Sequence, residues 1–393
     1  MSIELLDYIG GPFIFGVLLF CLALILFESF RYFVNRFFYG DILITVVSIL
    51  LIASIDYASL LLMTSIGWLT FYFATDRMIA RPRLFLVPFF VLVSLVAIKL
   101  IIRVSDSPFA FVGVSYYYFR LGAFAIERVR GNPAYKNVSA RDFFVWLYFF
   151  PLFLSGPIQR FHLFERDVTI KLNVTTVYLT IFFWIFVKVV VLDAVILNTV
   201  LLALRKMMAG GAEDLNGFYG IIVFCAHGFT SFLYGYLDFM AYMKIAMALG
   251  VMFGYKIIPN FNAPLLATNL VQFWRRWHIS LSDWARDYVH FPLMIKYKSV
   301  NLATLATMLT IGLWHGVNIN WIIWAVLHSA ALIVYYYFKL SFIYKLGVEN
   351  RISRGCMALG GWVVTMLFVG TVYNLVAIPS DYSAVWSVID VLF

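Results

Sequence analysis

His328 is the residue whose surroundings point most directly to chemistry. It lies in WIIWAVLHSAALIVYYYF, where nearly every neighbour on both sides is apolar. A helix of this composition can cross a bilayer, so we expect the imidazole near mid-membrane, where loss of water favours its neutral form. A neutral imidazole can take a proton from an alcohol as a general base. A structural histidine, hydrogen-bonded between two helices, is the alternative that the residues leave open.

Three further histidines have sequence contexts that can be interpreted. His278 follows the arginine-rich WRRW, and Ser282 lies one helical turn after it. This imidazole could orient or polarise an acyl carbonyl, although a surface position is an equal alternative. His315, in GLWHG, is expected at a helix end in a structural role, and His227, in a long apolar run, is expected to pack or to form a hydrogen bond.

Other kinds of site have little support in the sequence. The chain has no HExxH or HxxxH spacing and no carboxylate cluster near its histidines, so we expect no metal site. GxSxG, GxxxxGK and GxGxxG are also missing, which argues against hydrolase, ATPase and dinucleotide chemistry. We expect no bound cofactor. The cysteines lack CxxC spacing and are interpreted as packing residues: Cys21, Cys225 and Cys356.

Composition places the chain in a membrane. Hydrophobic residues make up 63% of its 393 residues and charged residues 12%, whereas about a quarter of the residues of a soluble domain are charged. Continuous apolar runs indicate helices rather than a β-barrel, and the length allows about ten crossings. The net charge of +9 comes from Lys and Arg scattered between these runs, which favours lipid contact over nucleic-acid binding.

We therefore expect an all-α polytopic membrane protein with a single domain over residues 1–393. The apolar runs lie at 12–30, 42–55, 58–75, 84–102, 109–126, 142–156, 174–204, 218–251, 300–315, 319–338 and 357–378. The acidic start favours retention of the first run as a helix over a cleaved signal peptide. Pro151 should break the helix of run 142–156. Run 109–126, which carries Arg120, is predicted to be a re-entrant or tilted segment.

The longest polar stretch lies at about 256–299 and cannot span a membrane. Its large apolar side chains recur at helical spacing, with charged residues on other faces. This pattern predicts amphipathic helices that lie at the headgroup level or close a cavity from one side.

These motifs resemble the bacterial membrane-bound O-acyltransferase family. The resemblance rests on FWRRWHISLS at 273–282 with the following RDY, and on GLWHG with Trp324 and His328. Weaker matches are SGPI with Arg160, Asp238-Phe239 and Asn260-Phe261-Asn262, and together the matches cover about 110–330. One departure is Trp324-Ala325-Val326-Leu327-His328-Ser329 in place of the family's WGxxHG, although Ala and Ser are still small enough for close helix packing.

The resemblance implies helices around a central funnel or tunnel, with His328 as the catalytic residue and His278 as its partner. It implies a thioester donor from the cytosol, either a phosphopantetheinyl acyl carrier protein or an acyl-coenzyme A. The acceptor would be a hydroxyl of an envelope polymer outside a bacterial inner or plasma membrane, with an accessory membrane or extracytoplasmic acyl-transfer protein as a further partner. The remaining candidates for donor or substrate binding are Trp277, Ser282, Arg275, Arg276, Arg286, Asp287, Trp324 and His315.

Two branches of the family stay open. The D-alanyl transferases of teichoic-acid modification resemble this chain in length, in SGPI with a following Arg, and in Asp-Phe. Polysaccharide and peptidoglycan O-acetyltransferases are usually longer and carry a Gly-Gly-Asn turn after RDY, where this chain reads HFPLMIK. The sequence WRRW nevertheless resembles the acetyl branch. We favour D-alanyl transfer slightly.

Two functions of other classes compete with acyl transfer. A transporter or flippase would use broken helices and the intramembrane charges Asp238, Lys188 and Lys244. No internal repeat supports it, and a structural ion pair involving Asp238 and Lys244 is the simpler interpretation. A purely structural envelope subunit would need neither His328 nor His278.

Overall fold

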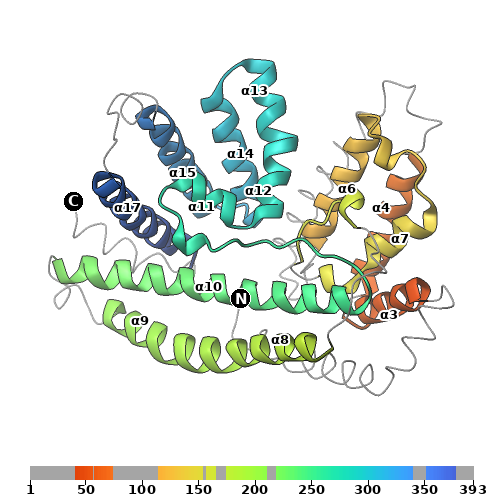
Figure 1. Cartoon of the computed structure of the whole chain (residues 1–393), viewed down its shortest axis with the longest axis horizontal. Coiled ribbons are helices and arrows are strands. Elements are labelled where there is room, and N and C mark those ends of the chain that lie inside the picture. Colours follow the sequence, from red (N-terminus) through yellow and green to blue (C-terminus); the bar gives the residue numbers. More distant parts are fainter. Residues whose placement is uncertain are drawn as a thin grey trace. The chain divides into compact units, whose positions relative to one another are not determined.

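The computed structural model describes residues 40–55, 57–73, 114–153, 156–164, 174–209, 218–339 and 351–377. The regular elements in these residues are all helices (Figure 1). The chain divides into two compact units, Met1–Leu154 and Ser155–Phe393, and each is described by itself. The predicted helices at 12–30 and 84–102 lie outside the described residues.

The described residues of the first unit form four α-helices: α3 (Gly40–Ile55), α4 (Tyr57–Phe73), α6 (Val114–Val129) and α7 (Ala140–Tyr148). Helix α7 begins after Ser139, whose hydroxyl accepts a hydrogen bond from the Asp142 amide. It ends at Tyr148, and the 3₁₀ turn η4 (Phe150–Leu152) follows. The predicted break near Pro151 is therefore present: Phe149 leaves helical backbone with ψ 100°, and Pro151 has no N–H with which to continue the hydrogen bonds of α7.

A buried arginine lies in the core of the first unit. Arg120 of α6 donates hydrogen bonds to the Trp146 and Leu147 carbonyls, and its guanidinium lies 4.6 Å from the centre of the Trp146 ring. These carbonyls belong to the last turn of α7, where backbone oxygens have no partner within the helix, and they bind the cation that the apolar run carries.

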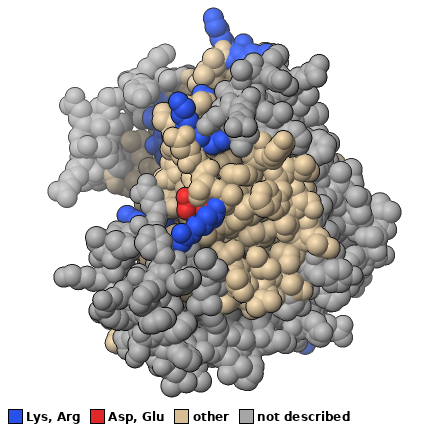
Figure 2. Space-filling view, turned by 90° about the vertical axis from the view of Figure 1, so that its right-hand side faces the viewer, with Lys and Arg blue, Asp and Glu red and all other residues tan. Residues whose placement is uncertain are grey.

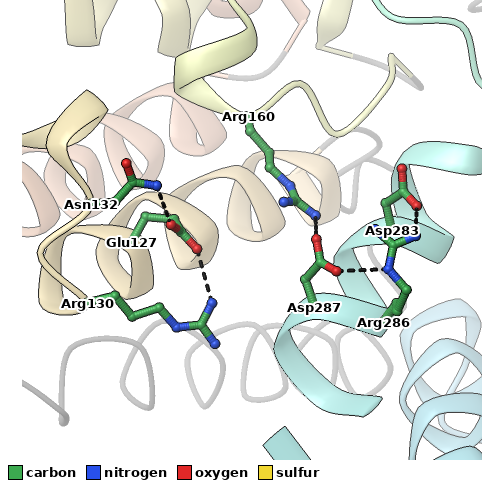
Figure 3. Close-up of polar contacts among 7 residues, drawn as sticks. All are labelled: Glu127, Arg130, Asn132, Arg160, Asp283, Arg286 and Asp287. Carbon is green, nitrogen blue, oxygen red and sulfur yellow. Dashed lines mark hydrogen bonds and ion pairs between the residues drawn. The ribbon is translucent and has the colours of Figure 1, made fainter. Parts of the chain in front are cut away.

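A second polar group lies at the end of α6. Glu127 there accepts hydrogen bonds from Arg130 at 3.1 Å and from Asn132 at 2.7 Å (Figure 3).

The second unit contains two long antiparallel layers of helix and a polar segment. Helices α8 (Val174–Phe186) and α9 (Leu202–Ala209) are joined by the π-helical η6 (Val187–Leu201) and pack along α10 (Phe218–Met252) (Figure 1). Helix α17 (Arg351–Ala377) also packs on α10, while α14 (Val300–His315) pairs with α15 (Ile319–Phe338). These pairings place the site described below between α10, α14, α15 and α17.

Small residues allow the closest helix approaches. A Cβ atom added at Gly312 of α14 would come within 2.6 Å of the Trp321 carbonyl oxygen and 3.0 Å of the Ala325 Cβ atom. At the crossing of α10 and α17, a Cβ atom on Gly228 would meet the Gly370 carbonyl oxygen at 2.3 Å. Neither position accepts a larger residue without separation of the helices.

Four described helices are long and apolar enough to cross a membrane: Thr175–Leu192, Tyr219–Met252, Ile319–Phe338 and Gly355–Val376. They coincide with four of the predicted apolar runs, and Val300–His315 is a shorter apolar helix. Large side chains on α8 are exposed, with Phe182 71% and Leu179 63% accessible. Figure 2 shows one face on which the described residues are mostly uncharged, with Lys and Arg at a few places. The count of about ten crossings, the central funnel and the single domain stay predictions.

The polar stretch folds into short helices, none of which is long enough to span a membrane. They are η7 (Pro264–Leu266), α11 (Leu270–Arg276), α12 (Ile279–Ala285), the π-helical η8 (Arg286–His290) and α13 (Phe291–Tyr297). The prediction of non-spanning helices here is confirmed. Their placement at the headgroup level stays a prediction.

Candidate functional site

The turn between α11 and α12 positions His278. Helix α11 begins after Asn269, whose side chain accepts a hydrogen bond from the Gln272 amide at 2.9 Å. His278 then adopts left-handed backbone with φ 43° and ψ 54°, a conformation that non-glycine residues rarely take. Its carbonyl accepts hydrogen bonds from the Leu281 and Ser282 amides, each at 3.0 Å. The chain can therefore start a new helix immediately and keep the His278 side chain inside.

His278 is buried, with 3% of its surface accessible. Its ring meets Phe239 of α10 at 4.9 Å between centroids and Trp314 of α14 at 5.9 Å, both edge to face. Loss of water lowers the pKa of His278 to about 3, because the surroundings do not solvate the charged form. The imidazole is neutral at physiological pH and can donate one hydrogen bond and accept another.

His328 lies in the middle of α15 and is only 2% accessible. Its ring lies 4.4 Å from Trp324, 5.1 Å from Phe368 of α17 and 5.5 Å from Trp274 of α11. The His328 Nδ1 and Trp274 Nε1 atoms are buried, and neither has a hydrogen-bond partner among the described residues. A buried polar atom without a protein partner is rare in a folded protein and often marks a functional position.

A series of ring contacts joins the two histidines. His278 contacts Trp314, Trp314 contacts His315 at 4.3 Å, His315 contacts Trp324 at 6.3 Å, and Trp324 contacts His328. His315 is the last residue of α14, as predicted for a helix end, and its ring stacks on Trp321 at 4.3 Å. The structure thus brings His278, His315, Trp324 and His328 into one aromatic cluster.

Trp277 and Ser282 hold the turn. The Trp277 ring stacks on Phe273 at 5.6 Å and packs against Tyr236 and Phe261 in the core beside α10. The Ser282 hydroxyl donates to the Trp277 carbonyl at 3.2 Å. Both candidates support the backbone around His278.

Two of the four candidate charged residues form an ion-pair network. Arg286 contacts Asp283 at 2.5 Å and Asp287 at 2.9 Å, and Arg160 reaches Asp287 at 2.7 Å (Figure 3). Burial raises the pKa of Asp287, but hydrogen bonds and charges from Arg286 and Arg160 outweigh this effect and lower it overall. Two positive charges face two negative ones, so the network is close to neutral and is a poor site for phosphate.

The other two arginines differ from each other. Arg276 donates to the Ala263 carbonyl at 3.3 Å, whereas the Arg275 side chain is exposed. Arg275 therefore suits an interaction outside the fold better than Arg276 does.

The intramembrane charges follow a different pairing from the one expected. Asp238 of α10 forms an ion pair with Lys188 of η6, which corrects the expected pairing with Lys244. The two partners lie on adjacent antiparallel helices, so the packing of those helices sets the pair. His227 accepts or donates a hydrogen bond at 2.8 Å to Asn374, in agreement with its predicted structural role.

Sequence reasoning missed several residues of this site. Trp314 adjoins His315 in GLWHG and could have been found from that motif. Phe368 lies in an apolar span like any other phenylalanine there, and nothing in its neighbours marks it. Asn260, which the sequence offered only as part of a weak family match, and Gln159 are buried polar residues of the irregular segments beside the His278 turn. Only their hydrogen bonds reveal their roles.

Comparison with known proteins finds the same family that the sequence motifs resemble. The model of the MBOAT, membrane-bound O-acyltransferase family, matches residues 50–372. The probable alginate O-acetylase AlgI of Pseudomonas fluorescens is 32% identical over 57% of this chain and 44% of its own length. The teichoic acid D-alanyltransferase of Streptococcus thermophilus is 28% identical over 84% of this chain and 83% of its own.

A third relative is the peptidoglycan O-acetyltransferase of Helicobacter pylori, which is 31% identical over 49% of this chain and 37% of its own length. The chain spans less than half the length of the alginate and peptidoglycan relatives. It spans most of the D-alanyltransferase.

Proposed function

Because the chain belongs to the membrane-bound O-acyltransferase family, we propose that it moves an acyl group from a cytosolic thioester donor to a hydroxyl of an extracytoplasmic cell-envelope polymer. Its predicted partners are a cytosolic acyl carrier protein and an accessory membrane or extracytoplasmic acyl-transfer protein. The observation that carries the proposal is the environment of His328. This imidazole lies mid-helix in a membrane span, with aromatic rings around it and an Nδ1 atom that has no partner in the described parts of the chain.

The proposed chemistry needs one base and a donor for the developing oxyanion. His328 takes the proton of the acceptor hydroxyl, whose oxygen attacks the thioester carbonyl carbon. His278 or backbone N–H groups stabilise the negative charge on the carbonyl oxygen. The carbon–sulfur bond then breaks, and the departing thiolate takes the proton from the imidazolium of His328. The acyl group ends as an ester, and no redox step is required.

D-alanyl transfer is the first candidate for the acyl group. The long match to the Streptococcus thermophilus D-alanyltransferase supports it, because that alignment covers most of both proteins. The sequences SGPI, Arg160 and Asp238-Phe239 support it as well.

O-acetyl transfer is the second candidate. The alginate relatives have higher identity over the part that they share with this chain, 33% over 240 residues in the Pseudomonas syringae protein. The WRRW sequence before His278 agrees with that branch.

A comparison of two acyl donors, supplied separately, distinguishes the two candidates. The purified protein in proteoliposomes receives either D-alanyl carrier protein or acetyl-coenzyme A in the lumen that represents the cytosol, with teichoic acid or a polysaccharide outside. Transfer from D-alanyl carrier protein but not from acetyl-coenzyme A supports the first candidate. Transfer from acetyl-coenzyme A without a carrier protein supports the second. No transfer from either donor by folded protein would refute the acyltransferase proposal, and His328→Ala serves as the inactive control.

A further inference from the structure

The backbone of His278 needs an external support. A left-handed residue directly before α12 is strained for a side chain with a Cβ atom. His278 is the N-cap residue of α12, yet its own side chain makes no capping hydrogen bond. The first N–H groups of a helix have no partner within the helix. Those of α12 must therefore be satisfied from another part of the chain.

Asn260 supplies these partners. The Ile279 amide donates to the Asn260 carbonyl oxygen at 2.9 Å, and the Ser280 amide donates to Asn260 Oδ1 at 3.1 Å. Asn260 Nδ2 donates to the sulfur of Met243 on α10 at 3.0 Å, and only 1% of the residue is accessible. One buried residue thus accepts from both N–H groups that follow His278, from Ile279 through its backbone carbonyl and from Ser280 through its side chain. Its side chain is also anchored on a spanning helix.

The segment that carries Asn260 is itself held in place. Gln159 accepts from the Ile258 amide at 3.1 Å and donates to the Lys256 carbonyl at 3.2 Å. On the other side, the Asn262 amide donates to the Arg276 carbonyl at 3.0 Å. The Ile158 amide donates to the Ser280 hydroxyl at 2.9 Å. Asn260 is therefore a rigid support, because the backbone on both sides of it is fixed.

We propose that Asn260 is a positioning residue that sets the orientation of His278 through the two N–H groups after the left-handed turn. This inference rests on the proposed function, in which His278 acts at the acyl carbonyl. Without the Asn260 side chain, the Ser280 N–H loses its acceptor. The turn can then relax toward ordinary helical or extended backbone, which would rotate the imidazole away from Phe239 and Trp314. Transfer would then be lost although every reacting group is present.

The test compares Asn260→Ala, Asn260→Asp and the control Asn262→Ala. Asn262 is exposed and joins the network only through its backbone amide, so its truncation should change nothing. Asn260→Ala should lower kcat about ten- to a hundredfold, the scale expected for a misplaced catalytic group, with KM little changed. Asn260→Asp keeps the accepting oxygen and should recover most of the rate. Asn260→Leu replaces the alanine variant where truncation prevents folding.

A double-mutant comparison and a chemical label test whether Asn260 affects transfer through His278. In a His278→Ala background, Asn260→Ala should cause no further loss of transfer, because the group that it positions is gone. Reaction of His278 with diethyl pyrocarbonate, followed by mass spectrometry, should be slow in the wild type and faster in Asn260→Ala. An additive loss in the double mutant, or unchanged labelling, would overturn the proposal. If no donor supports transfer by the wild type, the proposed function fails, and the labelling still decides the role of Asn260.

Discussion

The ring of His328 on α15 meets the ring of Trp274 on α11 edge to face, with centroids 5.5 Å apart and planes at 78°. A membrane-spanning helix and a non-spanning segment thereby share one buried contact. Each residue contributes a polar atom, His328 Nδ1 and Trp274 Nε1, that has no partner in the described chain. The first two predictions below concern these two atoms.

The first prediction separates a catalytic from a structural His328. Gln can keep a hydrogen bond but cannot accept a proton at neutral pH, so a general base should lose about a hundredfold or more of its transfer rate in both His328→Gln and His328→Ala. The measurement is acyl transfer normalised to folded, monodisperse protein in detergent. Near-normal transfer by His328→Gln would show that His328 is structural.

The second prediction concerns the indole N–H of Trp274. Trp274→Phe keeps a ring against His328 and removes an N–H that has no protein partner, so no hydrogen bond within the described fold is lost. We expect a fall in the free energy of unfolding of about 0.5–3 kcal/mol from the smaller ring. We expect transfer to fall by about a hundredfold if the N–H donates to the reacting group. Full activity of folded Trp274→Phe would exclude that role.

The third prediction is a pH dependence of stability. Burial lowers the pKa of His278 to about 3 in the folded protein, whereas in the unfolded chain it is about 6.5. Between these values the unfolded chain binds a proton that the folded chain excludes, so the free energy of unfolding falls as the pH falls through this window. His278→Gln should lose this part of the acid sensitivity.

Thermal unfolding of both proteins in detergent between about pH 7 and about pH 4 checks the third prediction. The melting temperature of the wild type should fall more steeply with acid than that of His278→Gln. Parallel curves for the two proteins would mean that His278 keeps an ordinary pKa in the fold.

The fourth prediction uses two adjacent glycines of α17. A Cβ atom on Gly361 would lie 2.4 Å from the Thr268 carbonyl oxygen, whereas one on Gly360 would meet nothing within 4 Å. Gly361→Ala should therefore cost about 1–3 kcal/mol of stability, because the backbone of the polar segment must shift. Gly360→Ala should be neutral, or stabilising by up to about 1 kcal/mol from helix propensity. Thermal unfolding of the two variants side by side provides the check, and equal loss in both would contradict the close approach.

The sequence by itself determined the class of this protein and its reactive residue types. Continuous apolar runs require lipid and helical hydrogen bonding, so four of the predicted runs coincide with the described spanning helices. The polar residues at 256–299 excluded a membrane-spanning helix, and the structure has short helices in this stretch. His328 was found because an ionisable group in an apolar span is costly and rare.

Only the tertiary structure decided which side chains meet. Periodicity describes the faces of one helix, whereas the contact of Phe368 with His328 and the pairing of Asp238 with Lys188 depend on which helices pack together. The same limit applies to Arg286, a sequence candidate for binding an acidic carrier, whose charge Asp283 and Asp287 balance. It applies most clearly to Asn260, because its partners are backbone N–H groups, which every residue except proline carries and which leave no trace in the sequence.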